Sequence, residues 1–399
     1  MARKSDVFCE KTSWHGREAY VVGNDLVRLF SVTGGGHVAD FHFDESTGRP
    51  SANPMWVPPW KPIEPQHYKH EKHSAKYGPL GVGKLLAGIA GQNLCLDIFG
   101  MPSEAEIKQG LCCHGEAGVQ KWQKAKARAT NQQAALTLAV GLPVAGLKFS
   151  REIALRRGEA VAYFSETVVN QRKADHFFHW TQHVTLGPPF VATGDTLVGI
   201  SATKGRTFPS GYDGEPLLEA GRDFRWPTAP KLGDGSVDLT HPFPEPGKGY
   251  IVSLLLDPRR GMEYISAVNT KLGLLIGYCF RRSDYPWVAI WHENCSRSDA
   301  PWSGRTQTLG LEFGASPFPI VRREAFDVGP LWGTPTHTCV SAGGKKNIRY
   351  VAFLAQVPQG FGGVRDIKLA ANEIIVHGSG TKEVVRVKAS GLAETGLLR

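Results

Sequence analysis

The sequence predicts an all-β protein, and both its composition and its hydrophobic pattern support this fold class. The 399 residues include 46 Gly, 26 Pro, 10 Trp, 10 Tyr and 19 Phe. Aromatic residues are enriched in strands, whereas Gly and Pro favour the turns that join them. Apolar and polar residues alternate in segments such as 25–32 and 37–43, with turn signals about every ten residues. We therefore expect many short strands in a meander, with few short helices, such as one at 103–109 that Ser103 would cap.

No linker visibly divides the sequence, and we expect a single domain that spans residues 1–399. Chains of this length often form one unit when they fold as large β-sandwiches or barrels. Two segments interrupt the strand pattern: a Pro- and aromatic-rich loop at about 50–80 and a Gly-, Pro- and Asp-rich excursion at about 205–248. The aromatic side chains of the first segment, Trp56 and Trp60 among them, favour an ordered loop, and we expect it to rim a binding site.

Charge and cysteine content exclude several classes of function. The formal net charge is +9, but the basic residues are spread along the chain, so we expect no nucleic-acid partner. The 7 cysteines form no C-x-x-C pair, which is typical neither of a zinc site nor of a disulfide framework. The N-terminal segment lacks an apolar signal core, and no apolar run is long enough to span a bilayer. We therefore expect a cytoplasmic protein that does not bind membranes.

The segment 176–190 combines a candidate strand with several histidines. Side chains alternate between the two faces of a strand, so one face of this segment would be apolar and the other polar. The apolar face would carry Phe178, Trp180, Val184 and Leu186, and the polar face His179, Thr181, His183 and Thr185. The polar face either forms part of a site or is exposed to solvent.

Two later strands carry carboxylates. In 287–294, Trp291 and Glu293 share one face, and an aromatic plane beside a carboxylate suits a sugar, although such tryptophans also occur in cores. In 307–319, Glu312 lies between Gly310 and Gly314, and glycine within a strand marks a place where another group approaches the backbone closely. Glu312 is therefore a candidate site residue, and the alternative is a solvated carboxylate.

The spacing of the histidines raises a metal-dependent alternative. One group is His67, His70 and His73, and the other is His176, His179 and His183. Imidazole groups in such numbers could bind a transition metal in an enzyme of cupin-like type. Lysines flank the first group, which favours an exposed basic loop without a regular frame. We expect no metal site and no other cofactor.

Four short motifs resemble, in order along the chain, those of the aldose 1-epimerases of the galactose-mutarotase-like superfamily. They are His114-Gly115, Val168-Val169-Asn170, the 176–190 segment and Leu309-Gly310-Leu311-Glu312. Within the 176–190 segment, the part from 183 to 190 is most similar to a divergent branch of that superfamily. The early asparagine and arginine that bind the sugar in these enzymes have no identifiable counterpart here. The segments 56–77 and 205–248 of this sequence also have no identifiable counterpart in these enzymes.

The resemblance implies a large antiparallel β-supersandwich and cofactor-free interconversion of the α and β anomers of a sugar. It implies that Glu312 is the base that takes the proton of the anomeric hydroxyl and that His183 is the acid that protonates the ring oxygen. His114 would hold a sugar oxygen. Reference pKa values of about 4.3 for Glu and about 6.5 for His suit these roles near neutral pH.

Several alternatives stay open at this point. His179 lies on the same strand face as His183 and is the alternative acid. We further expect the substrate to contact His179, Trp180, Trp291 and Glu293. A carbohydrate-binding protein on the same scaffold, without catalysis, is the second hypothesis. The expected partner is a small sugar or sugar derivative, and its identity, its phosphorylation and the oligomeric state of the protein are open.

Overall fold

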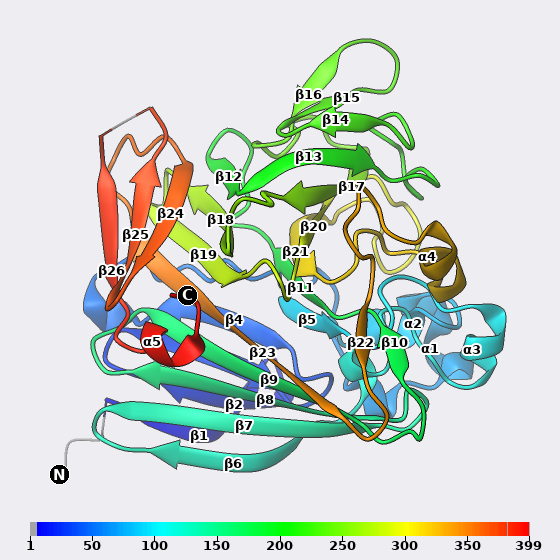
Figure 1. The fold of residues 1–399 in the computed structure, drawn as a ribbon, viewed down its shortest axis with the longest axis horizontal. Coiled ribbons are helices and arrows are strands. Elements are labelled where there is room, and N and C mark those ends of the chain that lie inside the picture. The colour runs from blue at the N-terminus through cyan, green and yellow to red at the C-terminus, as the bar shows by residue number, and fades with distance from the viewer. Residues whose placement is uncertain (1–5, 381, 399) are drawn as a thin grey trace.

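The computed structural model describes residues 6–380 and 382–398, and strands make up most of its regular structure (Figure 1). Most of the strands belong to two large sheets, of 13 and 8 strands, and a three-stranded and a two-stranded sheet complete the fold. The strands of both large sheets pair in antiparallel fashion. This arrangement confirms the predicted all-β fold class, a large antiparallel β-supersandwich with few short helices.

The first large sheet contains the strands that carry the predicted site. In spatial order it consists of β1 (Phe8–Trp14), β2 (Arg17–Gly23), β3 (Val27–Val32), β4 (Val38–Phe43), β5 (Gln92–Cys95), β11 (Thr181–Leu186), β21 (Gln307–Gly314), β20 (Trp287–Asn294), β17 (Lys248–Leu256), β13 (Ala202–Thr207), β14 (Asp223–Arg225), β15 (Thr228–Pro230) and β16 (Ser236–Asp238). Segments far apart in the sequence thus meet at its centre, where β5, β11, β21 and β20 are neighbours.

The second large sheet packs against the first. It consists of β12 (Thr196–Ile200), β18 (Met262–Asn269), β19 (Leu274–Arg281), β23 (Lys345–Gln356), β9 (Val161–Asn170), β8 (Leu147–Arg156), β7 (Gln133–Leu142) and β6 (Gln123–Ala129). The two small sheets are β24 (Val364–Ala370), β25 (Glu373–Gly378) and β26 (Val384–Lys388), and β10 (His176–Phe178) with β22 (Thr338–Val340).

The main core fills the space between the two large sheets. The apolar faces predicted for 176–186 and 307–314 both belong to it, because Val184, Leu311 and Phe313 are at most 1% exposed. Rings from the two sheets stack directly, as the Phe313 and Phe280 centroids lie 4.3 Å apart. A second apolar cluster joins the outer face of the second sheet to β24–β26, which lie beside it in Figure 1. The polar faces of β11 and β21 therefore point away from the main core.

The helices are short and gather mainly beside the central strands of the first sheet. They are α1 (His70–Tyr77), α2 (Gly83–Leu86), α3 (Glu104–Lys108), α4 (Arg322–Val328) and α5 (Leu392–Thr395), with 3-10 turns at Glu45–Thr47, Pro65–His67 and Ala117–Val119. Figure 1 shows α1, α2, α3 and α4 on one side, next to β5, β10 and β22. The helix predicted at 103–109 is α3, and Ser103 caps it together with Glu106 in a capping box.

Three local expectations need correction. The strand expected over 176–186 is divided into β10 and β11, because His176–Phe178 leaves the first sheet to pair with β22. The loop at 50–80 is not free of regular structure, since it contains α1. The excursion at 205–248 is not a loop alone, since β14, β15 and β16 extend the edge of the first sheet.

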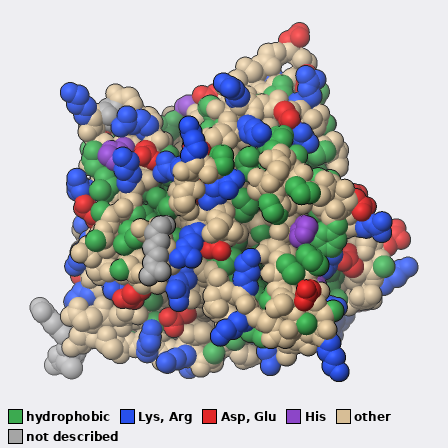
Figure 2. All heavy atoms as spheres, in the orientation of Figure 1, with side chains coloured by type: hydrophobic (Ala, Val, Ile, Leu, Met, Phe, Trp, Pro, Cys, Tyr) green, Lys and Arg blue, Asp and Glu red, His purple; other side chains and the backbone are tan. Residues whose placement is uncertain are grey.

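The surface shows basic and acidic side chains intermingled. On the face drawn in Figure 2, Lys and Arg side chains are scattered over the molecule, with acidic side chains among them. Within the described residues, no helix is long and apolar enough to cross a membrane.

Candidate active site

Glu312 and His183 form a direct pair at the centre of the first sheet. The two residues are exact partners in the antiparallel register of β11 and β21, so both side chains leave the sheet on the same face. His183 Nε2 lies 3.2 Å from Glu312 Oε1, and the two residues are 4% and 3% exposed. The Thr185 hydroxyl lies 2.9 Å from the other ring nitrogen of His183 and fixes the ring orientation. The sequence predicted both residues, and the fold brings them into contact.

Gly310 makes room for the carboxylate. A Cβ atom at this position would lie 2.6 Å from Glu312 Oε1 and 3.2 Å from Trp291 Cβ, which is too close for any side chain to fit without a shift. Gly314 has a different role, because a Cβ there would meet the backbone and side chain of Thr181. The close approach expected near Glu312 is therefore made by groups of the protein itself.

Asn93 extends the pair into a row across three strands. In the register of β5 and β11 it stands opposite His183, on the side away from Glu312. Its side chain is 0% exposed. Among the described residues, its Nδ2 has no hydrogen-bond partner, and its Oδ1 accepts only from the Cys95 thiol, at 3.7 Å. A buried amide donor without a partner is costly, and a ligand oxygen beside His183 would satisfy it. Nothing in the sequence singles out Asn93, because the four-residue strand β5 is buried on both faces.

His114 lies next to His183, with 5.0 Å between their ring centroids. Its Nδ1 accepts a hydrogen bond from the Gly100 backbone N–H at 3.1 Å, which places the ring proton on Nε2. The Phe99 ring stacks on the imidazole at 5.7 Å. Burial lowers the pKa of His114 to about 4, so the ring is neutral at neutral pH and is a hydrogen-bond donor at Nε2. These properties suit a group that holds a sugar oxygen.

His179 belongs to a neighbouring group of polar residues. Its Nδ1 accepts from the Phe99 backbone N–H at 3.0 Å, and its Nε2 has no partner among the described residues. Burial, aided by the charge of Arg322, lowers the pKa of His179 to about 3. Burial alone would raise the pKa of nearby Asp97, but His176 and Arg322 outweigh it and lower that pKa to about 2. His183 is therefore the better candidate acid, because it touches Glu312 directly.

Trp291 and Glu293 lie on β20 beside the pair, but their side chains make different contacts. The Trp291 ring lies 5.8 Å from the His183 ring, and its Nε1 donates to Tyr212 Oη at 3.3 Å. The Glu293 carboxylate accepts hydrogen bonds from the Ser296 backbone and hydroxyl, at 2.6 and 2.8 Å, and from Tyr212 Oη. Glu293 thus ties two surface segments to β20, whereas Trp291 borders the site.

Trp180 lies on the other side of the sheet. Its side chain is 0% exposed within the main core, and its Nε1 donates to Glu166 Oε2 at 3.1 Å. Successive residues of an extended chain point to opposite faces, so Trp180 points away from the face that carries His183. The structure does not bring Trp180 to the other predicted site residues, and we leave it out of the proposed site.

Aromatic side chains of the 50–80 segment and Trp302 pack against Trp291 beside the pair. The Trp56 backbone N–H donates to Thr185 O at 2.9 Å, which anchors the 50–80 segment on β11. The Trp56 ring contacts Trp291, and it stacks on Trp302 with 6.3 Å between centroids. Trp60 packs against both Trp56 and Trp302 at 5.5 Å. These contacts place the 50–80 segment next to Trp291, which borders the pair, and the expectation that the segment rims the site stays a prediction.

The pair is electrostatically a unit that holds one proton. Burial raises the pKa of Glu312 well above its usual value, because no water stabilises the carboxylate. Burial, together with neighbouring His114, lowers the pKa of His183 well below its usual value. Both shifts favour the uncharged forms of the two groups, and a single proton held by the pair leaves it without net charge whichever residue carries it.

The histidines proposed as alternative metal ligands do not converge. His176 Nε2 lies 2.9 Å from Asp97 Oδ2, while His179 receives the Phe99 N–H and His183 contacts Glu312. The group at 67–73 lies on a 3-10 turn and on α1 at the surface. Among the described residues, no three His, Cys, Asp or Glu side chains are grouped so that they could hold a metal ion.

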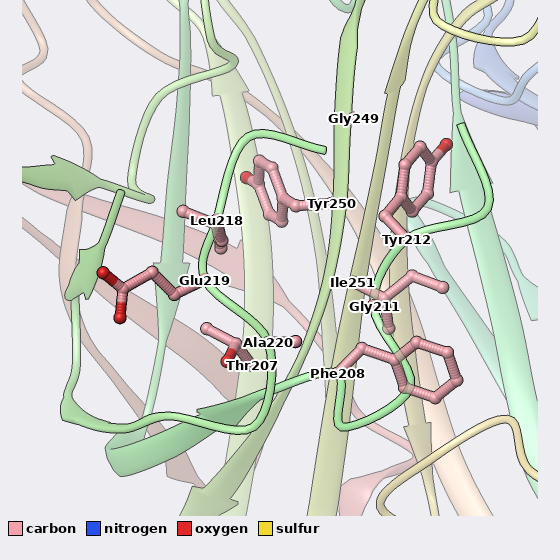
Figure 3. Close-up of a pocket in the computed structure, with 10 residues that line it drawn as sticks. All are labelled: Thr207, Phe208, Gly211, Tyr212, Leu218, Glu219, Ala220, Gly249, Tyr250 and Ile251. Carbon is pink, nitrogen blue, oxygen red and sulfur yellow. The ribbon is translucent and has the colours of Figure 1, made fainter. Parts of the chain in front are cut away.

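Two surface hollows lie away from the pair. The one drawn in Figure 3 lies between β17 and the 205–248 segment and is lined by Thr207, Phe208, Gly211, Tyr212, Leu218, Glu219, Ala220, Gly249, Tyr250 and Ile251. Its volume of about 10 Å³ has room for about one water molecule. The other, of about 200 Å³, lies on the outer face of the second sheet, where Arg156 pairs with Glu394 and Arg128 with Glu152. Neither includes a predicted site residue.

Three solved structures have a similar fold at low sequence identity. A Klebsiella pneumoniae protein described as a candidate aldose 1-epimerase has a TM-score of 0.64 and 14% identity, over 88% of this chain and 84% of its own. A galactose mutarotase-like protein from Clostridium acetobutylicum has a TM-score of 0.57 and 12% identity, over 89% and 100%. A galactose mutarotase related enzyme from Lactobacillus acidophilus has 0.52 and 14%, over 86% and 99%. The chain has the galactose-mutarotase-like fold.

These similarities show the fold of the protein, and they do not show its activity. No family model matches the sequence, and no curated protein is significantly similar to it. Identities of 12–14% leave the roles of individual residues to the geometry of this chain. Within the mutarotase-like fold, the residues that this chain brings together are His183, Glu312, His114, Asn93 and Trp291.

Proposed function

We propose that the protein interconverts the α and β anomers of a sugar, with Glu312 as the base and His183 as the acid and without a cofactor. The contact of 3.2 Å between the two side chains carries this proposal, because one group that takes and one that gives a proton must reach the same sugar. The neighbouring donors of Asn93 and His114 suit the hydroxyls of a sugar.

The reaction needs only proton transfers at two oxygen atoms of the sugar. The Glu312 carboxylate removes the proton of the anomeric hydroxyl while the His183 imidazolium protonates the ring oxygen. The bond between the anomeric carbon and the ring oxygen then breaks, which leaves an open-chain aldehyde. After rotation about the adjacent carbon–carbon bond, the freed hydroxyl attacks the other face of the carbonyl. Its proton returns to His183, and Glu312 gives its proton back to the anomeric oxygen.

The shared proton supplies both catalytic groups at once. With the proton on His183, Glu312 is ionised and the pair contains one acid and one base. The polar hydroxyls of a bound sugar favour this charged form over the neutral form, because they partly replace the water that burial removes. The Nε2 proton of His114 and the amide of Asn93 would hold the sugar oxygens during ring opening.

The decisive experiment compares the wild-type protein with Glu312→Gln. Anomer exchange of free and phosphorylated aldoses is followed by NMR or polarimetry, with the buffer rate as the baseline. We expect the wild type to accelerate exchange for at least one sugar and Glu312→Gln to lose at least about 100-fold, since a positioned base contributes about 10² to 10⁴. Circular dichroism checks that the variant is folded. Equal rates for the two proteins would refute the role of Glu312.

A carbohydrate-binding protein without catalysis is the second candidate, and the lack of identifiable counterparts to the early sugar-binding asparagine and arginine favours it. His183 and Glu312 are only 4% and 3% exposed, so a sugar reaches either of them only if neighbouring side chains move. Calorimetry with the same sugars separates the two candidates. Binding without any acceleration of anomer exchange would support this second candidate and overturn the first.

A further inference from the structure

A network of polar side chains lies in the main core directly behind the pair. Its members come from both large sheets and are at most 2% exposed. They are Gln92, Arg151, Glu166, Gln182, Tyr278, Tyr285 and Tyr350. Such groups are rarely placed in a core, because each must be fully hydrogen-bonded to avoid a large desolvation cost.

The network begins at the residues that precede the site residues in sequence. Gln92 is followed by Asn93 on β5, and Gln182 by His183 on β11. Because side chains alternate along a strand, the two glutamines point into the core and the two site residues point to the opposite face. Any shift of β5 against β11 would therefore disturb both faces together.

Gln182 is the centre of the network. Its Oε1 accepts hydrogen bonds from Gln92 Nε2 at 2.9 Å and from Arg151 Nη2 at 3.2 Å. Its Nε2 donates to Glu166 Oε2 at 2.7 Å and to Tyr285 Oη at 3.2 Å. The amide thus connects a neighbouring strand of its own sheet with two strands of the second sheet, β8 and β9.

Tyr350 and an ion pair hold the other end of the network on the second sheet. Arg151 on β8 and Glu166 on β9 are partners in register, and Arg151 Nε donates to Glu166 Oε1 at 2.7 Å. The Tyr350 hydroxyl lies 3.0 Å from Glu166 Oε1 and 3.1 Å from Gln182 Oε1, and it accepts from Gln92 Nε2 at 2.9 Å. One oxygen atom therefore joins both glutamines to the ion pair.

The two faces of the same strands differ in how their polar groups are bonded. In the described structure, no buried polar side-chain atom of the network lacks a partner, whereas Asn93 Nδ2, Thr181 Oγ1 and His179 Nε2 on the opposite face all do. The polar side chains on the core face of these strands thus have their hydrogen-bond partners within the described structure. The front face has donors available for a ligand.

Stability alone does not explain an ion pair at this place. Replacing a buried ion pair by well-packed apolar residues is often neutral or stabilising. Hydrogen bonds, unlike apolar contacts, are directional and lost when two strands slide by a residue, so they fix register. The network therefore suits a part of the core where the relative position of strands matters more than their affinity.

We propose that Gln92, Gln182 and Tyr350 are positioning residues. They keep the side chains of Asn93 and His183 in the same row across the strands as Glu312. The inference rests on the proposed function, because positions at this precision matter for proton transfer. A misplacement of about 1 Å can cost about 100-fold in rate even when the change is made far from the reacting atoms.

The test compares two Tyr→Phe variants that each lose one buried hydroxyl. Tyr350→Phe removes the oxygen that joins the glutamines to Glu166. Tyr264→Phe is the matched control, since the Tyr264 hydroxyl donates to Arg365 O at 2.9 Å on the outer side of the second sheet. We expect Tyr350→Phe to lower kcat by about tenfold or more with KM within about twofold, and Tyr264→Phe to change neither. The control accounts for the general effect of losing a buried hydroxyl.

Histidine-ring NMR provides a readout that does not depend on catalysis. The ¹⁵N signals of His183 are assigned by their absence in His183→Asn. We expect them to shift or broaden in Tyr350→Phe and to keep their wild-type positions in Tyr264→Phe. If Tyr350→Phe fails to fold, Tyr285→Phe takes its place, since it removes only the bond of 3.2 Å to Gln182.

The outcomes separate this inference from the proposed function. Wild-type kcat together with an unchanged His183 signal in Tyr350→Phe would overturn the positioning role. If the wild type itself does not accelerate anomer exchange, the proposed function fails. The NMR comparison then decides alone, and a His183 signal that moves only in Tyr350→Phe would still show that the network positions this side chain.

Discussion

A single shared proton decides when the pair of Glu312 and His183 is competent. Burial raises the pKa of Glu312 and lowers that of His183, so one proton stays on the pair over a wide range of pH. A second proton, taken up when the pH falls through the lowered pKa, removes the base. Loss of the shared proton, when the pH rises through the raised pKa, removes the acid.

We therefore expect kcat/KM for anomer exchange, which reports the groups of the sugar-free protein, to form a broad plateau across neutral pH. Ordinary pKa values of about 4.3 and 6.5 would instead give a narrow maximum between them. NMR exchange rates at sugar concentrations well below KM, from about pH 5 to about pH 9, measure the profile. Unfolding curves at each pH ensure that a loss of rate is not a loss of structure. A sharp maximum near pH 5.5, between those two ordinary values, would contradict the coupling of the two groups.

Asn93 and Gln182 offer a matched comparison of two buried amides. Asn93→Ala removes donors that have no partner in the free protein, so we expect the free energy of unfolding to change by no more than about 1 kcal/mol. The same variant should raise KM by about tenfold, because a sugar hydroxyl loses its donor. Gln182→Ala removes a fully bonded amide and should cost about 3 kcal/mol or more.

Urea unfolding and exchange kinetics measure the two effects separately. An unfolding cost for Asn93→Ala as large as that for Gln182→Ala would show that Asn93 has a structural partner rather than a ligand. An unchanged KM would place the sugar elsewhere.

At the scale of elements, alternation along single strands could be predicted and pairing between distant segments could not. β21 begins where the predicted segment 307–319 begins and ends at Gly314, after the alternation of Leu309, Leu311 and Phe313. The four residues of β5 are all buried, so no alternation indicates Asn93. The hydrogen bond from Tyr212 to Glu293 joins residues that are 81 positions apart in the sequence. The periodicity of a single strand cannot predict such a contact.

The 50–80 segment is an integral part of the fold rather than an appended loop. Trp56 is 1% exposed and contacts Trp60, Trp291 and Trp302. A Cβ atom at Gly187 would lie 2.7 Å from the Trp56 ring, so the strand end and the loop fit closely together. The position of the 50–80 segment beside Trp291 therefore depends on contacts that also stabilise the sheet.

Trp56→Ala should consequently destabilise the whole protein. Removing a fully buried tryptophan costs about 3–5 kcal/mol, because the surrounding rings cannot fill the cavity. Val57→Ala is the control in the same segment, since Val57 is 39% exposed and its truncation should cost less than about 0.5 kcal/mol. Urea unfolding measures both variants. A cost below about 1 kcal/mol for Trp56→Ala would mean that the loop unfolds on its own, without the sheet.

At the scale of the whole molecule, buried neutral histidines make the fold sensitive to acid. Burial lowers the pKa of His37 and His179 to about 3 and that of His114 and His292 to about 4. In the unfolded chain these groups titrate near 6.5. As the pH falls below about 6.5, the unfolded state takes up protons that the folded state excludes, so the free energy of unfolding decreases.

His37 provides the test, because it lies outside the proposed site. Its Nδ1 accepts from the Ala90 N–H and its Nε2 donates to Gly118 O, both at 3.0 Å. Below pH 6 each such histidine should contribute about 1.4 kcal/mol per pH unit to the slope of unfolding free energy against pH. His37→Gln should reduce that slope between pH 4 and about pH 6 by roughly this amount, whatever its cost at neutral pH. Urea unfolding followed by tryptophan fluorescence gives the slopes, and identical slopes for the wild type and His37→Gln would show that His37 takes up its proton in the folded state as readily as in the unfolded one.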